Sequence, residues 1–177
     1  MTAYILEDMK QPISYLISGS VVAIASYPFI KWIYYYMGRK RLNRKESISL
    51  FLMVVYLAVL AETVYFSRPS FSRDRVNMTL MGTWGTTFRS HAYVIENFML
   101  FLPFGILLPL CLSKARKSWV CMLSGCLISI VIETVQYITQ RGNCELDDVI
   151  MNTLGTAAGW GIYAGVRKIK KIRRNRS

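Results

Sequence analysis

Five long apolar runs constrain the fold of this chain more than any other feature. They cover residues 13–36, 48–66, 94–112, 119–138 and 149–166. Each run is near the roughly 20 residues that an α-helix needs to cross the hydrocarbon core of a bilayer. A segment in lipid must be helical, because no water is present to satisfy free backbone N–H and C=O groups. The sequence therefore predicts an all-α membrane protein with about five transmembrane helices in a small bundle.

The composition agrees with a membrane protein. Hydrophobic residues make up 53% of the chain and the mean hydropathy is +0.31, whereas roughly 45–50% is usual for soluble domains. A length of 177 residues favours one membrane domain over residues 1–177. The first run has no basic leader and no cleavage pattern of small residues, so we expect it to be a retained helix rather than a signal peptide.

Basic residues gather at one set of helix ends. Fifteen of the 22 Lys and Arg residues lie between the first and second runs, between the third and fourth runs, or after the fifth run. The positive-inside rule assigns these three segments to the cytoplasm. The N-terminus and a loop over residues 67–92 are then expected outside, whereas the C-terminus, with a basic tail over residues 167–177, is expected in the cytoplasm. We expect this tail to contact anionic membrane lipids rather than nucleic acid.

Polar residues interrupt the last two apolar runs at helical spacing. Glu133 and Gln136 lie in the fourth run, and Asp148 and Asn152 open the fifth. Residues three or four positions apart share one face of a helix, so the two members of each pair are expected to face in the same direction. Carboxylates inside a membrane are costly and are usually paired, inward-facing and functional. The spacing therefore predicts an inward-facing polar site.

Other polar residues are expected at the same depth, in the outer leaflet. Glu62 lies about one turn from the end of the second run, and Asn97 is drawn into the third run if that helix is to span about 30 Å. The predicted binding site comprises Glu62, Arg68, Asn97, Glu133, Gln136, Arg141, Asp147, Asp148 and Asn152.

If the site is catalytic, Glu133 or Asp148 would act as general acid or base, and Arg141 or Arg68 would hold a phosphate group. No cofactor and no metal site are expected. The single histidine, His91, and the lack of a C-x-x-C pair provide no ligand set. The sequence also lacks a Gly-rich phosphate loop.

Each of these residues also has a structural interpretation. Glu133 could accept a hydrogen bond from a neighbouring helix, and Gln136 could form an interhelical bond worth about 1 kcal/mol. Asp147 or Asp148 could cap the fifth helix, and Arg141 could pair with either aspartate. Two glycine pairs are expected to be surfaces for close helix packing, namely Gly155 with Gly159 and Gly161 with Gly165.

Three ordered blocks resemble the VanZ family of small bacterial membrane proteins. The blocks are Asn97-Phe-Met-Leu-Phe-Leu-Pro-Phe-Gly105, Glu133-x-x-Gln136 and Asp148-x-x-x-Asn152-x-x-Gly155-x-x-x-Gly159. The resemblance covers residues 93–165, a core of three helices, and leaves two preceding transmembrane helices within residues 13–66. It implies a multi-pass protein of the bacterial plasma membrane. It also implies resistance to lipoglycopeptide antibiotics of the teicoplanin type in Gram-positive bacteria.

Three classes of function fit such a site. The protein could bind or shield an outer-leaflet lipid or a lipoglycopeptide antibiotic, and so lower sensitivity to the drug. It could instead be a membrane-embedded acid–base enzyme acting on a lipid-linked precursor of the cell envelope. It could also transport a lipid, but the lack of a sequence repeat and of a second polar cluster argues against that class. An enzyme should lose activity on Glu133→Gln, whereas a binding protein could tolerate this near-isosteric change. The oligomeric state stays open.

Overall fold

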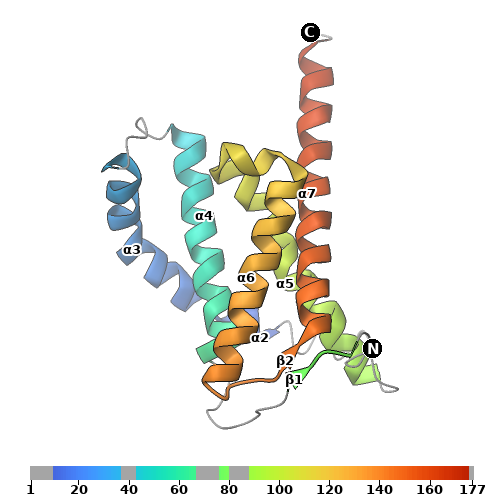
Figure 1. Cartoon of the computed structure of the whole chain (residues 1–177). Helices are drawn as coiled ribbons and strands as arrows, with labels where there is room; N and C mark the ends of the chain where they lie inside the picture. The colour runs from blue at the N-terminus through green and yellow to red at the C-terminus, as the bar shows by residue number, and fades with distance from the viewer. Residues whose placement is uncertain (1–9, 37–42, 67–75, 80–87, 176–177) are drawn as a thin grey trace.

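The structure is a computed structural model, and it describes residues 10–36, 43–66, 76–79 and 88–175 (Figure 1). Almost all of these residues are helical. The α-helices are α2 (Lys10–Ser14), α3 (Leu16–Tyr36), α4 (Arg44–Ala61), α5 (Phe88–Cys111), α6 (Ser118–Ile138) and α7 (Leu146–Arg174). A π-helical turn, η1 (Glu62–Phe66), extends α4, and a 3-10 turn, η2 (Ser113–Arg116), connects α5 to α6.

Four helical segments of the described chain are long and apolar enough to cross a membrane. They are Leu16–Ile33, Arg44–Phe66, His91–Cys111 and Ser118–Ile138. The all-α membrane class predicted from the sequence agrees with this architecture. The fifth predicted span, 149–166, lies within α7 and is not among the four. Asparagine, threonine and glycine residues interrupt the apolar residues of α7, so its status as a span stays a prediction.

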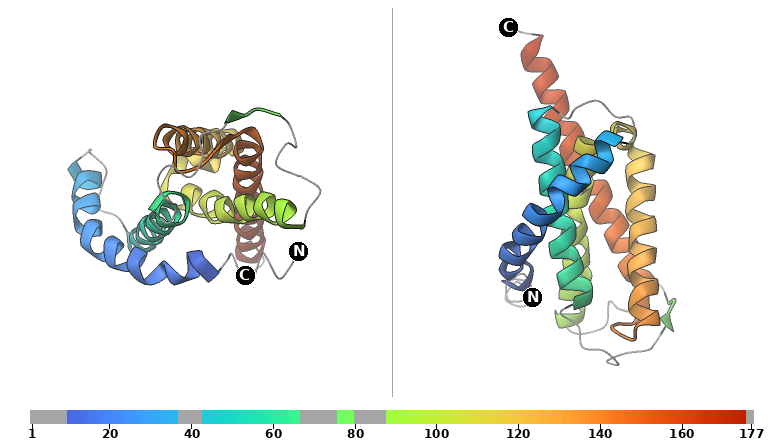
Figure 2. Two further views of the ribbon diagram at one scale, coloured as in Figure 1. Left: turned by 90° about the horizontal axis from the view of Figure 1, so that it is seen from below. Right: turned by 90° about the vertical axis from the view of Figure 1, so that its left-hand side faces the viewer.

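The helices form a bundle with one helix set apart. Helix α7 packs against α5 and α6, whereas α3 packs on α4 at the edge of the bundle (Figures 1 and 2). The apolar core lies among α4, α5 and α6 and includes Met53, Leu60, Phe101, Phe104 and Cys121. Large apolar side chains also cover the outer surface; Ile17 is 78% exposed and Ile138 is 72% exposed. Such a surface suits lipid, where apolar exposure carries no penalty.

The start of two helices differs from the sequence prediction. Helix α4 begins at Arg44 rather than at residue 48, because Asn43 and Glu46 form a capping box. The Asn43 side chain accepts the Glu46 N–H at 2.9 Å, and the Glu46 side chain accepts the Asn43 N–H at 3.1 Å. Helix α5 begins at Phe88, so the last part of the predicted 67–92 loop is helical. Hydropathy alone does not reveal where these helices begin, because the first turn of each consists mainly of polar residues.

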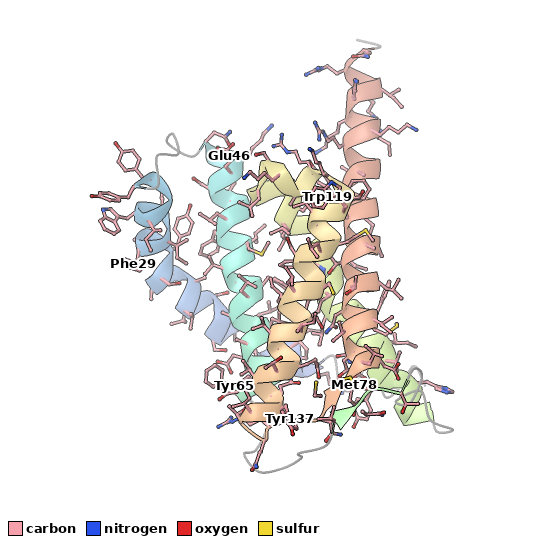
Figure 3. The ribbon with its side chains drawn as sticks, in the orientation of Figure 1. Phe29, Glu46, Tyr65, Met78, Trp119 and Tyr137 are labelled. Carbon is pink, nitrogen blue, oxygen red and sulfur yellow. The ribbon has the colours of Figure 1, made fainter. Side chains whose placement is uncertain are left out.

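The two ends of the bundle differ in chemistry. The start of α4, η2 and the end of α7 lie at one end (Figure 1), and all three contain basic residues. Figure 3 shows Glu46 and Trp119 at this end, and Tyr65 and Tyr137 at the other. A short parallel sheet lies at this second end, where β1 (Val76–Asn77) pairs with β2 (Cys144–Glu145). The hydropathy and spacing patterns do not predict this pairing.

Candidate functional site

One face of α6 is buried and polar toward its C-terminal half. Ser129, Glu133 and Gln136 are at most 3% exposed, and Cys121 and Gly125 continue the same face toward the start of the helix. These five positions recur every three or four residues, which places them on one stripe of an α-helix. The stripe therefore brings a hydroxyl, a carboxylate and an amide to the inside of the bundle.

Helix α7 presents a matching polar face. Asp147, Asn152 and Thr156 are buried, at 7%, 4% and 0% exposed. Asn152 Nδ2 donates to Ser129 Oγ at 2.8 Å, and Thr156 Oγ1 donates to the Asn152 carbonyl at 2.9 Å. Asn152 Oδ1 is buried and has no hydrogen-bond partner in the described part of the chain. We call the face-to-face set Ser129, Glu133, Gln136, Asp147, Asn152 and Thr156 the polar seam.

Glycines allow the helices of the seam to approach closely. A Cβ at Gly155 would overlap the Phe98 carbonyl of α5, and one at Gly159 would overlap the Leu102 carbonyl. A Cβ at Gly125 would overlap the Thr156 side chain. The predicted packing role of Gly155 and Gly159 is therefore confirmed. The same prediction for Gly161 and Gly165 is wrong, because no neighbouring helix of the described chain comes within 4 Å of a Cβ at either position.

The turn between α6 and α7 closes one end of the seam. Glu133 Oε2 accepts the backbone N–H of Glu145 at 3.1 Å. Asn143 Nδ2 donates to Glu145 Oε1 at 3.0 Å. Burial raises the pKa of the Cys144 thiol in this turn, and the nearby carboxylates of Glu133, Asp148 and Glu145 raise it further. Three carboxylates thus lie near one thiol, and the carboxylate of Glu133 also positions the turn.

The other edge of the seam reaches the end of α4. Gln136 Nε2 donates to the Val64 carbonyl at 2.6 Å, and Arg141 Nη1 donates to the Tyr65 carbonyl at 3.3 Å. The Arg141 guanidinium also lies over the Tyr65 ring, 4.7 Å from its centroid. Val64 and Tyr65 belong to η1, and the carbonyls of a final helical turn have no partner within their own helix. Side chains of α6 and the following turn supply those partners.

Several predicted residues have other environments. Asp148 is half-buried, whereas its neighbour Asp147 is buried. Glu62 and Asn97 are half-buried on η1 and α5, and the bonds described above do not connect them to the seam. Arg68 lies outside the described residues.

Two members of the seam, Ser129 and Thr156, were not among the predicted site residues. Ser129 lies one helical turn from Glu133, and Thr156 lies one turn from Asn152. Helical spacing from these predicted residues therefore indicates both positions. Three or more His, Cys, Asp or Glu side chains do not gather into a metal-binding group within the described ranges. The seam instead offers hydrogen-bonding groups and carboxylates.

Comparison with known families identifies the chain. The family model for VanZ/LLP1 matches residues 26–168, which is most of the sequence. The chain belongs to the VanZ/LLP1 family. Searches of curated proteins and of solved structures returned no match. In this VanZ/LLP1 protein the matched region includes α4, η1, α5, α6 and the buried half of α7, so it contains the whole polar seam. The match also extends well before residue 93, where the resemblance noted in the sequence begins.

Proposed function

We propose that this VanZ/LLP1 protein lowers the sensitivity of a Gram-positive bacterium to lipoglycopeptides of the teicoplanin type. It would act in the outer leaflet of the plasma membrane by binding a lipid-linked envelope component or the antibiotic at the polar seam. The observation that carries this proposal is the burial of Glu133 and Gln136 on α6, a helix long and apolar enough to cross a membrane, beside the buried Asp147 and Asn152 of α7. Intramembrane polar groups of this kind are expensive, so a functional role is the default expectation.

The hydrogen bonds of Glu133 favour binding over catalysis. A general acid or base must be within reach of the proton that it transfers, whereas Glu133 Oε2 already accepts the Glu145 N–H. The buried Asn152 Oδ1 offers an acceptor that a ligand could use. The alternative is an acid–base enzyme acting on a lipid-linked envelope precursor, and two buried carboxylates from different helices, Glu133 and Asp147, support it. In that case Glu133→Gln would inactivate the protein.

The η1 end of the bundle would lie outside the cell. That end holds the turn between α6 and α7, whereas the basic residues of η2 and of the end of α7 lie at the other end (Figure 1). The positive-inside rule then assigns the basic end to the cytoplasm. In this orientation the polar seam would lie at the depth of the outer leaflet, where a lipoglycopeptide meets the membrane.

Cys144 provides a test of this orientation. In a variant whose other cysteines are alanine, we expect an impermeant maleimide to label Cys144 on intact cells. Labelling should be slow at neutral pH, because a raised pKa lowers the fraction of reactive thiolate. The rate should rise as the pH is increased, and Glu133→Gln should accelerate it at neutral pH by removing one of the charges that raise the pKa. Labelling seen only after lysis would reverse the orientation.

The proposed role predicts a drug-selective phenotype. Expression of the protein in a sensitive Gram-positive host should raise the inhibitory concentration of teicoplanin. Vancomycin, which has no lipid tail, should inhibit the same cells and empty-vector cells equally. Membrane abundance of the protein is measured in parallel by immunoblot. Equal teicoplanin sensitivity of both strains, with the protein present in the membrane, would contradict the proposed role.

A further inference from the structure

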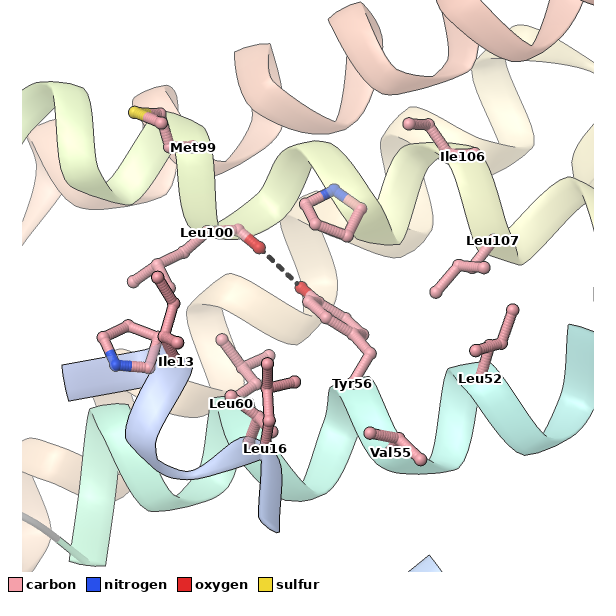
Figure 4. A pocket seen from close by; sticks show the side chains of 13 residues that line it. Ile13, Leu16, Leu52, Val55, Tyr56, Leu60, Met99, Leu100, Ile106 and Leu107 are labelled. Atoms are coloured by element: carbon pink, nitrogen blue, oxygen red, sulfur yellow. Dashed lines mark hydrogen bonds between the residues drawn. The ribbon is translucent and has the colours of Figure 1, made fainter. Parts of the chain in front are cut away.

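A second feature of the molecule is an apolar cavity on the side of the bundle (Figure 4). It has a volume of about 480 Å³ and lies between the start of α3, α4 and α5. On α4 it extends from Leu52 to Leu60, and on α5 from Met99 to Leu107. Pro12 and Ile13 of α2 border one end. The cavity is distinct from the polar seam, which lies among α6, α7 and η1.

The arrangement of α2 and α3 leaves this space open. Helical structure is interrupted at Tyr15, so α2 and α3 are separate helices. Helix α3 packs against α4 and diverges from the rest of the bundle (Figure 2). One close contact anchors it: a Cβ at Gly19 would approach Val59 of α4. The cavity therefore lies between the start of α3 and α5, and α4 forms the side that connects them.

The residues that line the cavity are almost all apolar. Tyr56 is the one residue of the described lining with a polar side chain, and its hydroxyl donates to the Leu100 carbonyl at 2.9 Å (Figure 4). This bond already engages the Tyr56 hydroxyl within the protein. Because an apolar cavity without free polar partners does not hold ordered water, the occupant must be apolar.

The cavity is elongated along α4. Leu52 to Leu60 spans eight residues, or about 12 Å along the axis of this helix. Leu16, Leu52 and Met99 are exposed, so the cavity opens toward the bilayer. A lipid acyl chain is apolar, is elongated, and is available from the bilayer on which the cavity opens.

Charge near one end of the cavity fits a phospholipid. Lys10 is exposed and is the first residue of α2, two positions before Pro12. Helix α2 contacts η1, so Lys10 belongs to the end of the bundle that carries η1. An ammonium group at the membrane interface attracts a lipid phosphate. We propose that one acyl chain of a membrane phospholipid occupies this cavity, with its phosphate near Lys10. This inference needs the membrane location but not the proposed resistance role.

The test compares two tryptophan substitutions on α4. Leu52 and Leu57 are both exposed, at 47% and 41%, but only Leu52 lines the cavity. Leu52→Trp should fill the cavity, whereas Leu57→Trp should leave it open. Each full-length protein is reconstituted in phosphatidylcholine vesicles that contain phosphatidylglycerol with a photoreactive diazirine on one acyl chain. After illumination, crosslinked residues are mapped by mass spectrometry.

We expect crosslinks concentrated at Met99 and Leu107 in the unaltered protein and in Leu57→Trp, and their loss in Leu52→Trp. Lys10→Glu, which leaves the lining intact, should reduce the same crosslinks. Crosslinks spread evenly over α5 and the exposed face of α6 would overturn the proposal, because they would report only the surrounding lipid. The absence of lipid crosslinks at Met99 and Leu107 in the unaltered protein would also overturn it, since the cavity would then hold no acyl chain. Equal labelling in Leu52→Trp and Leu57→Trp would have the same consequence.

Discussion

Gly155→Val should prevent the close approach of α5 and α7 and destabilise the bundle by about 3 kcal/mol or more, at the upper end for overpacked interiors. Even a Cβ at this position would overlap the Phe98 carbonyl. Backbone atoms cannot move aside as a flexible side chain can, so the two helices must separate. Separation would also pull Asn152 from Ser129, because Asn152 lies one turn before Gly155 on the same buried face.

Gly161→Val is the matched control for this effect. Gly161 lies on the same helix, but no neighbouring helix of the described chain comes within 4 Å of a Cβ at this position. Valine replaces glycine in both variants, so the control makes the same change in helix propensity without the clash. The measurement is thermal unfolding in detergent, combined with size-exclusion chromatography. Equal unfolding temperatures for the two variants would contradict the α5–α7 packing described above.

Periodicity allowed much of the polar seam to be predicted from the sequence. Glu133, Gln136 and Asn152 are spaced so that each lies on the inner face of its helix, and the structure places all three at 3–4% exposed. The same rule separates polar from lipid-facing positions on α6, where Ile130 and Val131 are exposed. A helix in a membrane has few other ways to accommodate such residues. Local spacing was therefore sufficient for these positions.

Contacts between distant segments could not be predicted in this way. The acceptors of Gln136 and Arg141 are backbone carbonyls of η1, and a carbonyl has no sequence signature. Which aspartate is buried, Asp147 or Asp148, depends on where α7 begins, and hydropathy does not determine that to one residue. The glycine pairs show the same limit: Gly155 and Gly161 have similar sequence contexts, but of the two only Gly155 faces another helix of the described chain.

Replacing the hydrogen-bonding groups of the seam should abolish protection against teicoplanin. Asp147→Ala removes a buried carboxylate of α7, and Glu133→Leu removes a buried carboxylate of α6. Each should return the inhibitory concentration to that of the empty vector, because a ligand would lose a hydrogen-bond partner in a buried site. Glu133→Gln should keep most of the protection, since its side-chain oxygen can still accept the Glu145 N–H.

Glu46→Gln is the control for the loss of a carboxylate. Glu46 is half-buried and caps α4 at the opposite end of the bundle (Figure 3), and glutamine can serve in a capping box as well. This variant should protect as the unaltered protein does. Loss of protection in Glu133→Gln together with Glu133→Leu would instead support the acid–base enzyme.

The most direct test of the polar seam is the teicoplanin susceptibility of cells that express Asp147→Ala at the same membrane abundance as the unaltered protein. Asp147 lies in the first turn of α7 and is 7% exposed, against 3% for Glu133, so its substitution is the less disruptive of the two to folding. Sensitivity equal to that of the empty vector, with Glu46→Gln still protective, is the result that we predict. Full protection by Asp147→Ala and by Glu133→Leu would contradict a functional role for the seam.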